Sequence, residues 1–268
     1  MRTPAALWRV FRSAAKGWGK HNGTRIAASL AFFSVFSLAP ILILIVAAVG
    51  LFFGMTHIKG EIQGQVALLI GHRGSGIVGT LMDAYARHGS DRFTLTVAGV
   101  LVIVYVVGLF IQVQNALDDI WEIPPHVKGG FLKVVVFRAH ALLALLALAI
   151  IALGAFGSIE LIPELGHAGM AVNVAALAVF LTVIYRVLPQ VEIRWSSAAI
   201  GGVITTITLV LGEAALSLYF RNLHPGAPFG ALESFVVVLL WLHYSAVLLV
   251  FGAELTRAFE MDHPSTWT

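Results

Sequence analysis

The sequence contains no cysteine, and only 12% of its 268 residues are charged. The absence of cysteine excludes a disulfide framework and thiolate metal sites. A water-soluble domain carries about a quarter of charged residues, which cover its outer surface. This chain has half of that fraction, together with 59% hydrophobic residues and a mean hydropathy of +0.90. We therefore predict an integral membrane protein.

Long apolar runs predict the fold class, because a helix needs about 20 largely apolar residues to cross a bilayer. Six stretches of the chain meet this requirement: about 26–53, 93–111, 134–157, 170–188, 198–220 and 235–254. The alternating pattern of a membrane β-strand is absent from them. We predict an all-α, polytopic membrane helix bundle with about six transmembrane helices, forming a single membrane domain over residues 1–268.

Lysine and arginine predict the orientation of this bundle. If both termini lie in the cytoplasm, the inside segments hold 12 of these residues and the outside segments hold 5. Cytoplasmic loops of membrane proteins carry an excess of lysine and arginine. We therefore predict that both termini are cytoplasmic.

The segments before and after the first span predict further helices. Residues 1–25 have the pattern of a basic amphipathic helix, which lies at an anionic lipid surface. Its predicted apolar face consists of Leu7, Phe11, Ala15 and Trp18. Alternatively, its charges only orient the first span. Residues 54–92 contain two apolar patterns at helical spacing, and we predict a helical outer loop there.

Glu213 and His243 form a candidate buried pair on the last two spans. Glu213 follows Ser197, Gly201 and Thr205 at multiples of four residues, and small residues mark a helix interface. Counting 1.5 Å per residue from the inner ends places Glu213 at about 22 Å and His243 at about 20 Å. We predict that the two side chains pair, either beside a transport pathway or as a polar clamp between helices.

Pro40 predicts a kink in the first span at a depth similar to that of Glu213. Proline removes a backbone hydrogen bond, and the hydroxyl groups of Ser34 and Ser37 can satisfy the freed groups. A kinked helix opposite a buried carboxylate favours a substrate cavity, although static bundles also contain such kinks.

Polar residues near the predicted cytoplasmic ends form a second candidate cluster: Asn115, Asp118, Asp119, Arg186, Glu254 and Arg257. Asp118 and Asp119, with Glu122, could hold Mg²⁺ for phosphodiester chemistry, or could solvate a helix end. Glu254 and Arg257 stand at i and i+3, which predicts a structural ion pair.

Other sequence motifs give no support for a cofactor or a metal. Residues 74–79 match G-x-G-x-x-G, but an amphipathic helix precedes them where dinucleotide binding requires a strand. No H-E-x-x-H occurs, and no two histidines are spaced i, i+4. We predict no catalytic residue, no metal and no cofactor.

Several collinear segments resemble the YihY/BrkB family of bacterial inner-membrane proteins: 27–40, 112–121, 185–189, 229–234, 240–246 and 251–255. The resemblance covers about residues 5–260. It implies six spans and a location in the bacterial inner membrane. It implies no reaction, because members of the family carry older labels both as a ribonuclease and as a virulence factor.

Three classes of function compete at this point. A transporter or translocator of a lipid, or of another amphipathic envelope molecule, explains Glu213 and the kinked span. A non-catalytic scaffold for envelope machinery explains the bundle without any pathway. A ribonuclease needs a basic groove for RNA, which the short cytoplasmic segments do not supply. We predict a transporter that is not an enzyme. Its expected partners are membrane lipids, with a homo-oligomer or an envelope protein as further candidates and no nucleic acid.

Overall fold

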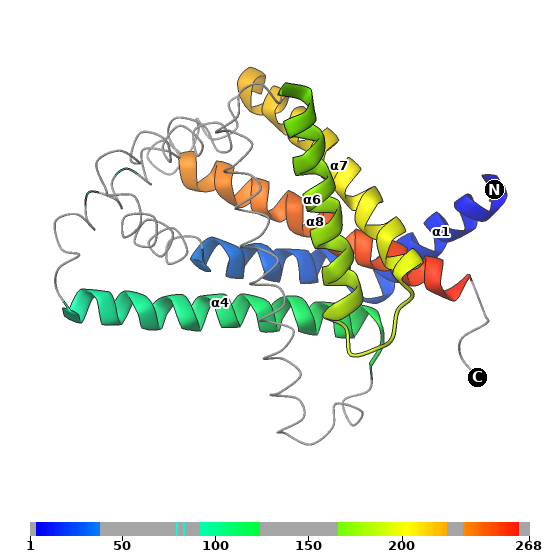
Figure 1. Cartoon of the computed structure of the whole chain (residues 1–268), viewed down its shortest axis with the longest axis horizontal. Coiled ribbons are helices and arrows are strands. Elements are labelled where there is room, and N and C mark those ends of the chain that lie inside the picture. Colours follow the sequence, from blue (N-terminus) through cyan, green and yellow to red (C-terminus); the bar gives the residue numbers. More distant parts are fainter. Residues whose placement is uncertain are drawn as a thin grey trace. The chain divides into compact units, whose positions relative to one another are not determined.

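The computed structural model describes residues 4–37, 79, 83, 92–123, 166–223 and 233–262. Within these ranges all regular structure is helical and no strand occurs, which confirms the all-α fold (Figure 1). The labelled helices are α1 (Pro4–Lys20), α4 (Arg92–Ile120), α6 (Gly166–Val187), α7 (Trp195–Leu223) and α8 (Glu233–Met261). A shorter apolar helix, Gly23–Ser37, follows α1.

The chain divides into two compact units. Unit 1 comprises residues 1–27, 113–215 and 247–268, and unit 2 comprises residues 28–112 and 216–246. The helix Gly23–Ser37 and α7 begin in unit 1, whereas α4 and α8 end there. Helix α6 lies wholly within unit 1. The single membrane domain stays a prediction.

The predicted spans agree with the observed helices where both can be compared. Two described helical segments, Trp195–Leu216 and Phe235–Met261, are long and apolar enough to cross a membrane. Large apolar side chains stay exposed along one side of α7, at Ile200, Val203, Ile207 and Leu211, as expected of a surface that faces lipid.

Helices α4, α6, α7 and α8 are longer than the apolar runs that predict them. The run 93–111 predicts only part of α4, which continues to Ile120 through polar residues that pack inside unit 1. The predicted span 134–157, most of the loop 54–92 and the first span beyond Ser37, including Pro40, lie outside the described residues.

The N-terminal helix ends earlier than predicted. It stops at Lys20, and Asn22 adopts a left-handed backbone with φ of 55°. Asparagine tolerates this conformation better than most residues. The carbonyl of Asn22 then accepts a hydrogen bond from the Ile26 N–H at 3.2 Å, which starts the next helix.

The face of α1 that packs against α8 is not its predicted apolar face. Val10, Ala14 and Gly17 are buried, whereas Phe11 and Ala15 of the predicted face are exposed. Val10 and Ala14 share a core cluster with three residues of α8: Leu255, Ala258 and Phe259. The packed face lies about one residue, roughly 100° around the helix, from the predicted apolar face, and the contact of that apolar face with lipid stays a prediction. Small residues bring α1 close to α8, and the rings of Phe11 and Trp18 contact that of Phe251 in α8, with centroids 5.8 and 6.1 Å apart.

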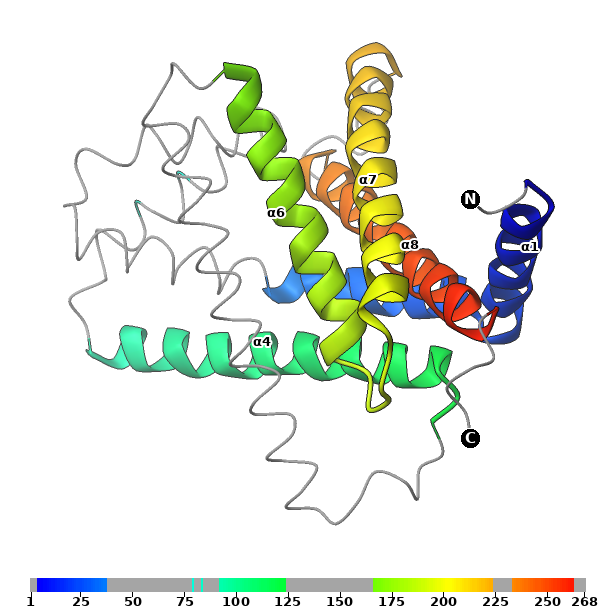
Figure 2. The ribbon, with the colours of Figure 1, turned by 45° about the vertical axis from the view of Figure 1, so that its right-hand side comes forward.

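Small residues also bring α7 and α8 together in unit 1, where α6 lies beside them (Figure 2). A Cβ atom added to Gly201 would collide with Thr256, and one added to Gly252 would collide with Thr205. The Tyr185 hydroxyl of α6 donates to the Leu249 carbonyl at 2.9 Å and lies 3.2 Å from Oγ1 of Thr205. Close packing and hydrogen bonds of this kind hold membrane helices together, because lipid supplies no hydrophobic driving force between them.

Candidate functional site: a charged network between three helices

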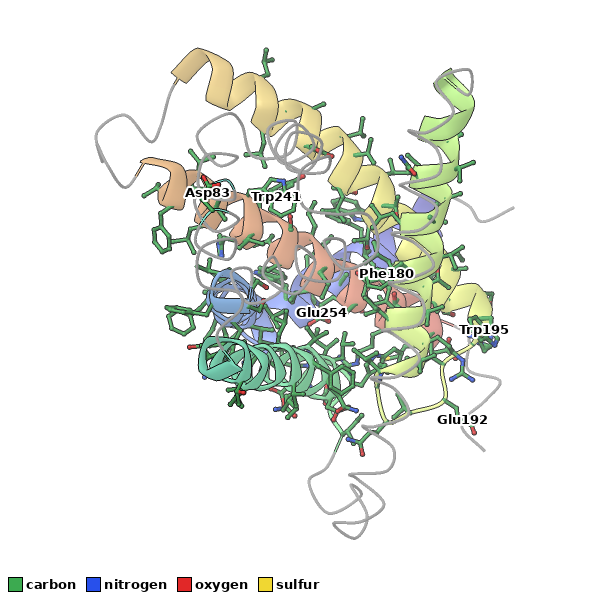
Figure 3. The ribbon with its side chains drawn as sticks, turned by 60° about the vertical axis from the view of Figure 1, so that its left-hand side comes forward. Asp83, Phe180, Glu192, Trp195, Trp241 and Glu254 are labelled. Atoms are coloured by element: carbon green, nitrogen blue, oxygen red, sulfur yellow. The ribbon has the colours of Figure 1, made fainter. Side chains whose placement is uncertain are left out.

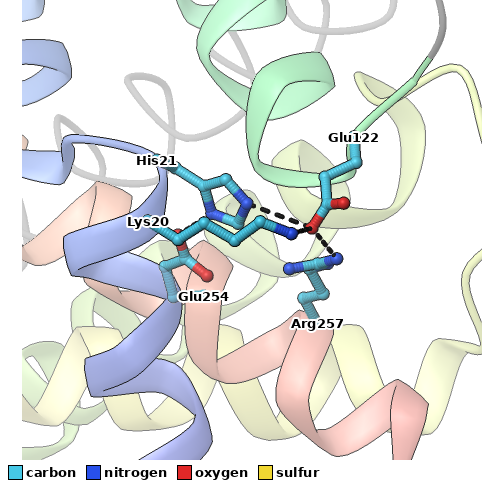
Figure 4. A network of polar contacts seen from close by, with 5 residues as sticks. All are labelled: Lys20, His21, Glu122, Glu254 and Arg257. Atoms are coloured by element: carbon cyan, nitrogen blue, oxygen red, sulfur yellow. Dashed lines mark hydrogen bonds and ion pairs between the residues drawn. The ribbon is translucent and has the colours of Figure 1, made fainter.

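Five charged or ionisable residues meet within unit 1, although they come from distant parts of the sequence. They are Lys20 and His21 at the end of α1, Glu122 after α4, and Glu254 and Arg257 of α8 (Figure 4). Oε1 of Glu122 accepts hydrogen bonds from Lys20 Nζ, at 2.8 Å, and from Arg257 Nη2. Nε2 of His21 lies 3.2 Å from the same oxygen. On its other side, the His21 ring places Nδ1 at 2.6 Å from Oε1 of Glu254.

The backbone of Glu122 is in the left-handed region, with φ of 53°. Its N–H donates to the Asp119 carbonyl, and the Ile123 N–H donates to the Asp118 carbonyl, each at 3.1 Å. These two bonds form a Schellman motif, in which glycine usually occupies the position of Glu122. A side chain there costs about 1–2 kcal/mol. The chain therefore holds this carboxylate at a strained position in front of its basic partners.

The network has a buried half and an exposed half. The side chains of His21 and Glu254 are only 7% and 2% exposed, while those of Lys20 and Glu122 are 64% and 40% exposed. Glu254 lies among the helices in Figure 3, whereas Glu192 lies at the edge of the described structure. A Cβ atom added to Gly17 would collide with the Glu254 carboxylate, so glycine is required for this approach of α1.

The two contacts of His21 need one proton more than a neutral imidazole and two ionised carboxylates carry. An ionised carboxylate only accepts hydrogen bonds, and a neutral imidazole has a single N–H. Both ring nitrogens therefore bond their carboxylates only if the ring is protonated or one carboxyl group carries the proton. The ammonium of Lys20, helped by His21 and Arg257, lowers the pKa of Glu122 from 4.5 to about 2. Glu122 is thus ionised at neutral pH.

The predicted cluster of six polar residues divides into separate groups. The structure records no hydrogen bond or ion pair between Glu254 and Arg257: Glu254 contacts His21, and Arg257 donates to Glu122. Asp118 is buried and accepts hydrogen bonds from the Gln190 backbone N–H, at 3.3 Å, and from its Nε2, at 2.9 Å. Asp118 therefore fastens the end of α4 to the connection between α6 and α7.

Arg186, another member of that cluster, makes its recorded contact with an aromatic ring. The Arg186 guanidinium is 5.7 Å from the ring centroid of Trp195, at the start of α7. Asp119 is exposed and Asn115 is half-buried. No group of three histidine, aspartate or glutamate side chains in the described parts of the chain is arranged to hold a metal ion.

The candidate pair of Glu213 and His243 is not brought together by any contact that the structure records. Glu213 is exposed in unit 1, and His243 is half-buried in unit 2. Glu213 does not share the buried face of Ser197 and Thr205, because each step of four residues advances the helix by about 40° beyond a full turn. Ser197 and Thr205 are buried, but Glu213 has rotated away from their face. The pairing itself stays a prediction.

Ser37 is the one described residue of the predicted kink. Its hydroxyl donates to the Ser34 carbonyl at 2.9 Å. Pro40 would free the carbonyl of Phe36, whereas this bond uses the carbonyl of Ser34. The kink therefore stays a prediction.

Sequence reasoning missed Lys20 and His21 as members of a site. His21 is 101 residues from Glu122 and 233 residues from Glu254, so no local spacing indicates the contacts. A weak signal was available in Asn22, which follows a basic helix end and favours a turn.

The apolar, lipid-exposed helices with a charged network at their ends define an α-helical membrane protein. A comparison with protein families matches residues 14–266 to the family described as Virulence factor BrkB. The chain therefore belongs to this family, which confirms the resemblance found in its sequence.

Relatives of this chain are described as UPF0761 membrane proteins. One from Laribacter hongkongensis is 24% identical over 254 residues, which cover 91% of this chain and 59% of the relative. One from Bordetella petrii is 22% identical, and the match covers 99% of this chain and 61% of the relative. One from Alteromonas mediterranea is 24% identical, and the match covers 89% of this chain and 85% of the relative. The chain thus spans about three fifths of the length of the first two relatives. No solved structure matches the chain.

Proposed function

We propose that the chain is a membrane transport protein that moves a lipid, or another amphipathic envelope molecule, across the bacterial inner membrane. One observation carries the proposal: an apolar groove of about 470 Å³ lies in unit 1 where α1, α7 and α8 meet. Its walls include Val10, Phe11, Ile204, Thr208, Leu248 and Phe251. Ligand sites in proteins have volumes of roughly 300–1,000 Å³ and mostly apolar walls.

The outer side of α1 supplies the polar half of an amphipathic site. Trp8 and Phe11 are exposed, with ring centroids 6.1 Å apart, and Phe11 also lines the groove. Arg9, Arg12 and Lys16 are exposed on the same helix. Aromatic and basic side chains together favour the headgroup level of a membrane. An acyl chain in the groove would therefore have its headgroup beside α1.

The charge distribution supports an orientation with both termini in the cytoplasm. Of the described lysine and arginine residues, eight belong to unit 1 and two, Arg92 and Arg221, belong to unit 2. Both termini belong to unit 1. By the enrichment of positive charge on the cytoplasmic side, we place both termini in the cytoplasm.

Lipid movement in liposomes tests the proposal. Fluorescent phosphatidylethanolamine in both leaflets would be exposed to an impermeant reductant, with and without a membrane potential or a pH gradient. The purified protein should lower the protected fraction of the lipid. Leu248→Trp, which fills the groove, should slow this movement by about tenfold, whereas Leu211→Trp on the exposed side of α7 should not. Lipid movement no faster than in protein-free liposomes, under every gradient, would contradict the proposal.

A membrane scaffold is the second candidate, and a different groove favours it. Ala171, Val174, Ala175 and Ala178 of α6 line a hollow of about 440 Å³ against α7. Small residues of this kind allow another helix to approach closely. If the protein only holds partners together, Ala175→Trp should abolish its cellular phenotype and Leu248→Trp should not. The opposite pattern favours transport.

A nuclease has less support than either of these functions. Asp118, one of the three carboxylates considered for Mg²⁺, is buried and bonded to Gln190. We propose that the protein is not an enzyme. Purified protein with Mg²⁺ should cleave RNA no faster than the Asp118→Ala variant, and turnover that depends on Asp118 would contradict this.

A further inference from the structure

Three basic or ionisable side chains in unit 1 converge on a single oxygen atom. Lys20, His21 and Arg257 all reach Oε1 of Glu122 (Figure 4). We infer that these three side chains form a binding site for a phosphate group, and that the Glu122 carboxylate occupies this site until a phosphate replaces it.

The first argument is that Glu122 does not accept a hydrogen bond from every donor that faces it. Arg257 donates to Glu122 through Nη2, while its buried Nε finds no acceptor among the described residues. A guanidinium group donates two parallel hydrogen bonds to a phosphate or a carboxylate that presents two oxygens. Glu122 presents one oxygen to all three donors. A phosphate presents more oxygens, and it can accept from Nε and Nη2 of Arg257 together with Lys20 and His21.

The second argument is that the structure places the carboxylate where it can be released. Glu122 is strained in a left-handed backbone conformation, and its side chain is 40% exposed. Lys20, on the open side of the site, is 64% exposed. Release of Glu122 therefore needs no separation of packed helices, and part of its cost is offset by relief of backbone strain.

The third argument concerns charge. When Glu122 leaves, Lys20 and Arg257 keep two positive charges, and only the Glu254 carboxylate opposes them. The His21 ring stands between that carboxylate and the site, because Nδ1 faces Glu254 and Nε2 faces Glu122. An anion must then balance the remaining positive charge, since partly buried charges without a counter-charge are costly.

The same phosphate chemistry has two sources at a membrane surface, a lipid headgroup and a free phosphate ion. For the lipid source, the inference deepens the proposed function and rests on it, because it names the headgroup that the transporter would take. Binding of free phosphate to purified protein does not depend on transport. A failure of one proposal is therefore distinguishable from a failure of the other.

Thermal unfolding of the purified full chain in detergent, with increasing inorganic phosphate at constant ionic strength, tests the site. Phosphate should raise the midpoint temperature of the wild-type protein more than chloride does. Glu122→Gly should bind phosphate about tenfold more tightly, because the variant empties the site and relieves the strain. Glu122→Gln serves if the glycine variant does not fold.

Two further variants separate this site from general basic charge. Arg257→Gln should weaken phosphate binding by about tenfold, since it loses a charged hydrogen bond. Arg194→Gln removes an arginine of the same unit that instead pairs with Glu260, and it should leave phosphate binding unchanged. Nanodiscs with and without phosphatidylglycerol then identify the source. Loss of phosphate binding when this lipid is present identifies a headgroup site, and unchanged binding identifies a site for free phosphate. If phosphate stabilises neither the wild-type protein nor the Glu122 variants beyond chloride, the inference is wrong.

Discussion

Nδ1 of His21 lies 2.6 Å from a carboxylate oxygen of Glu254, and both side chains are almost fully buried. The two residues belong to the first and last described helical regions of the chain, 233 positions apart. Their contact holds the end of α1 against α8 beside the core cluster of Val10, Ala14 and Phe259. It therefore couples the N-terminal helix to the last helix through a polar bond as well as through apolar packing.

Removal of either partner should destabilise the protein. His21→Leu leaves the Glu254 carboxylate buried without its partner, at a cost of roughly 3 kcal/mol. Glu254→Leu leaves His21 with Glu122 as its remaining partner, so this variant should lose less stability. The double variant should lose less than the sum of the two, which thermal unfolding in detergent would measure. Strict additivity would show that the two side chains do not interact.

Acid should weaken the network through Glu122. The pKa of this carboxyl group is lowered from 4.5 to about 2 by Lys20, His21 and Arg257. Its contribution to stability is therefore complete above pH 4.5, and is lost as the pH falls from 4.5 toward 2. The contribution is modest because the side chain is partly exposed.

Unfolding temperatures of the wild-type protein and of Glu122→Gln, compared from neutral pH downward, measure this contribution. The advantage of the wild-type protein should shrink only below the ordinary pKa of 4.5. A difference that is already lost at neutral pH, or that persists to the most acid conditions, would contradict this assignment.

The helices that face lipid were predictable, because an apolar run of sufficient length has one stable form in a bilayer. The runs 198–220 and 235–254 lie inside α7 and α8 for this reason. Hydropathy could not predict the last part of α4, where Gln114 and Asp118 are polar and yet buried. Gln114 donates through Nε2 to the Leu188 carbonyl, and Asp118 accepts from Gln190, so both bond the connection after α6. No local sequence pattern indicates such distant partners.

The site was less predictable than the fold, and its residues show why. Apolar spacing favoured the aromatic face of α1, but close packing depends on Ala14 and Gly17, which carry little hydropathy. Glu122 occupies a turn position where glycine usually stands, so the sequence gives no sign of its left-handed backbone conformation. The contacts of His21 depend on tertiary structure alone.

Single cysteines can test the predicted topology, because the chain has none of its own. Ser13→Cys lies on the exposed side of α1 and Ser158→Cys lies in a predicted outer segment. With both termini in the cytoplasm, an impermeant thiol reagent added to intact cells should label the second variant and spare the first. Permeabilised cells should show labelling of both, which serves as the control. Labelling of Ser13→Cys in intact cells would reverse the orientation.

The pairing of Glu213 with His243 can be tested by the same thermodynamic logic. If the side chains bond within the membrane, Glu213→Ala and His243→Ala should each lower the unfolding temperature, and the double variant should lose less than their sum. The exposed position of Glu213 gives the competing expectation, in which its replacement changes stability by less than about 0.5 kcal/mol. If the losses in unfolding temperature of the two single variants add up in the double variant, the two side chains do not pair.

Gly17 and Gly19 form a matched pair of positions on α1. A Cβ atom at Gly17 would collide with the buried Glu254 carboxylate, whereas one at Gly19 would meet nothing within 4 Å. Gly17→Ala should therefore push α1 away from α8 and lower the free energy of unfolding by about 1–3 kcal/mol. Gly19→Ala should leave it unchanged or raise it by up to about 1 kcal/mol, because alanine favours the helix. Because both variants make the same chemical change two residues apart, helix propensity cannot explain a difference between them. Equal unfolding temperatures for the two variants would show that α1 does not pack on Glu254.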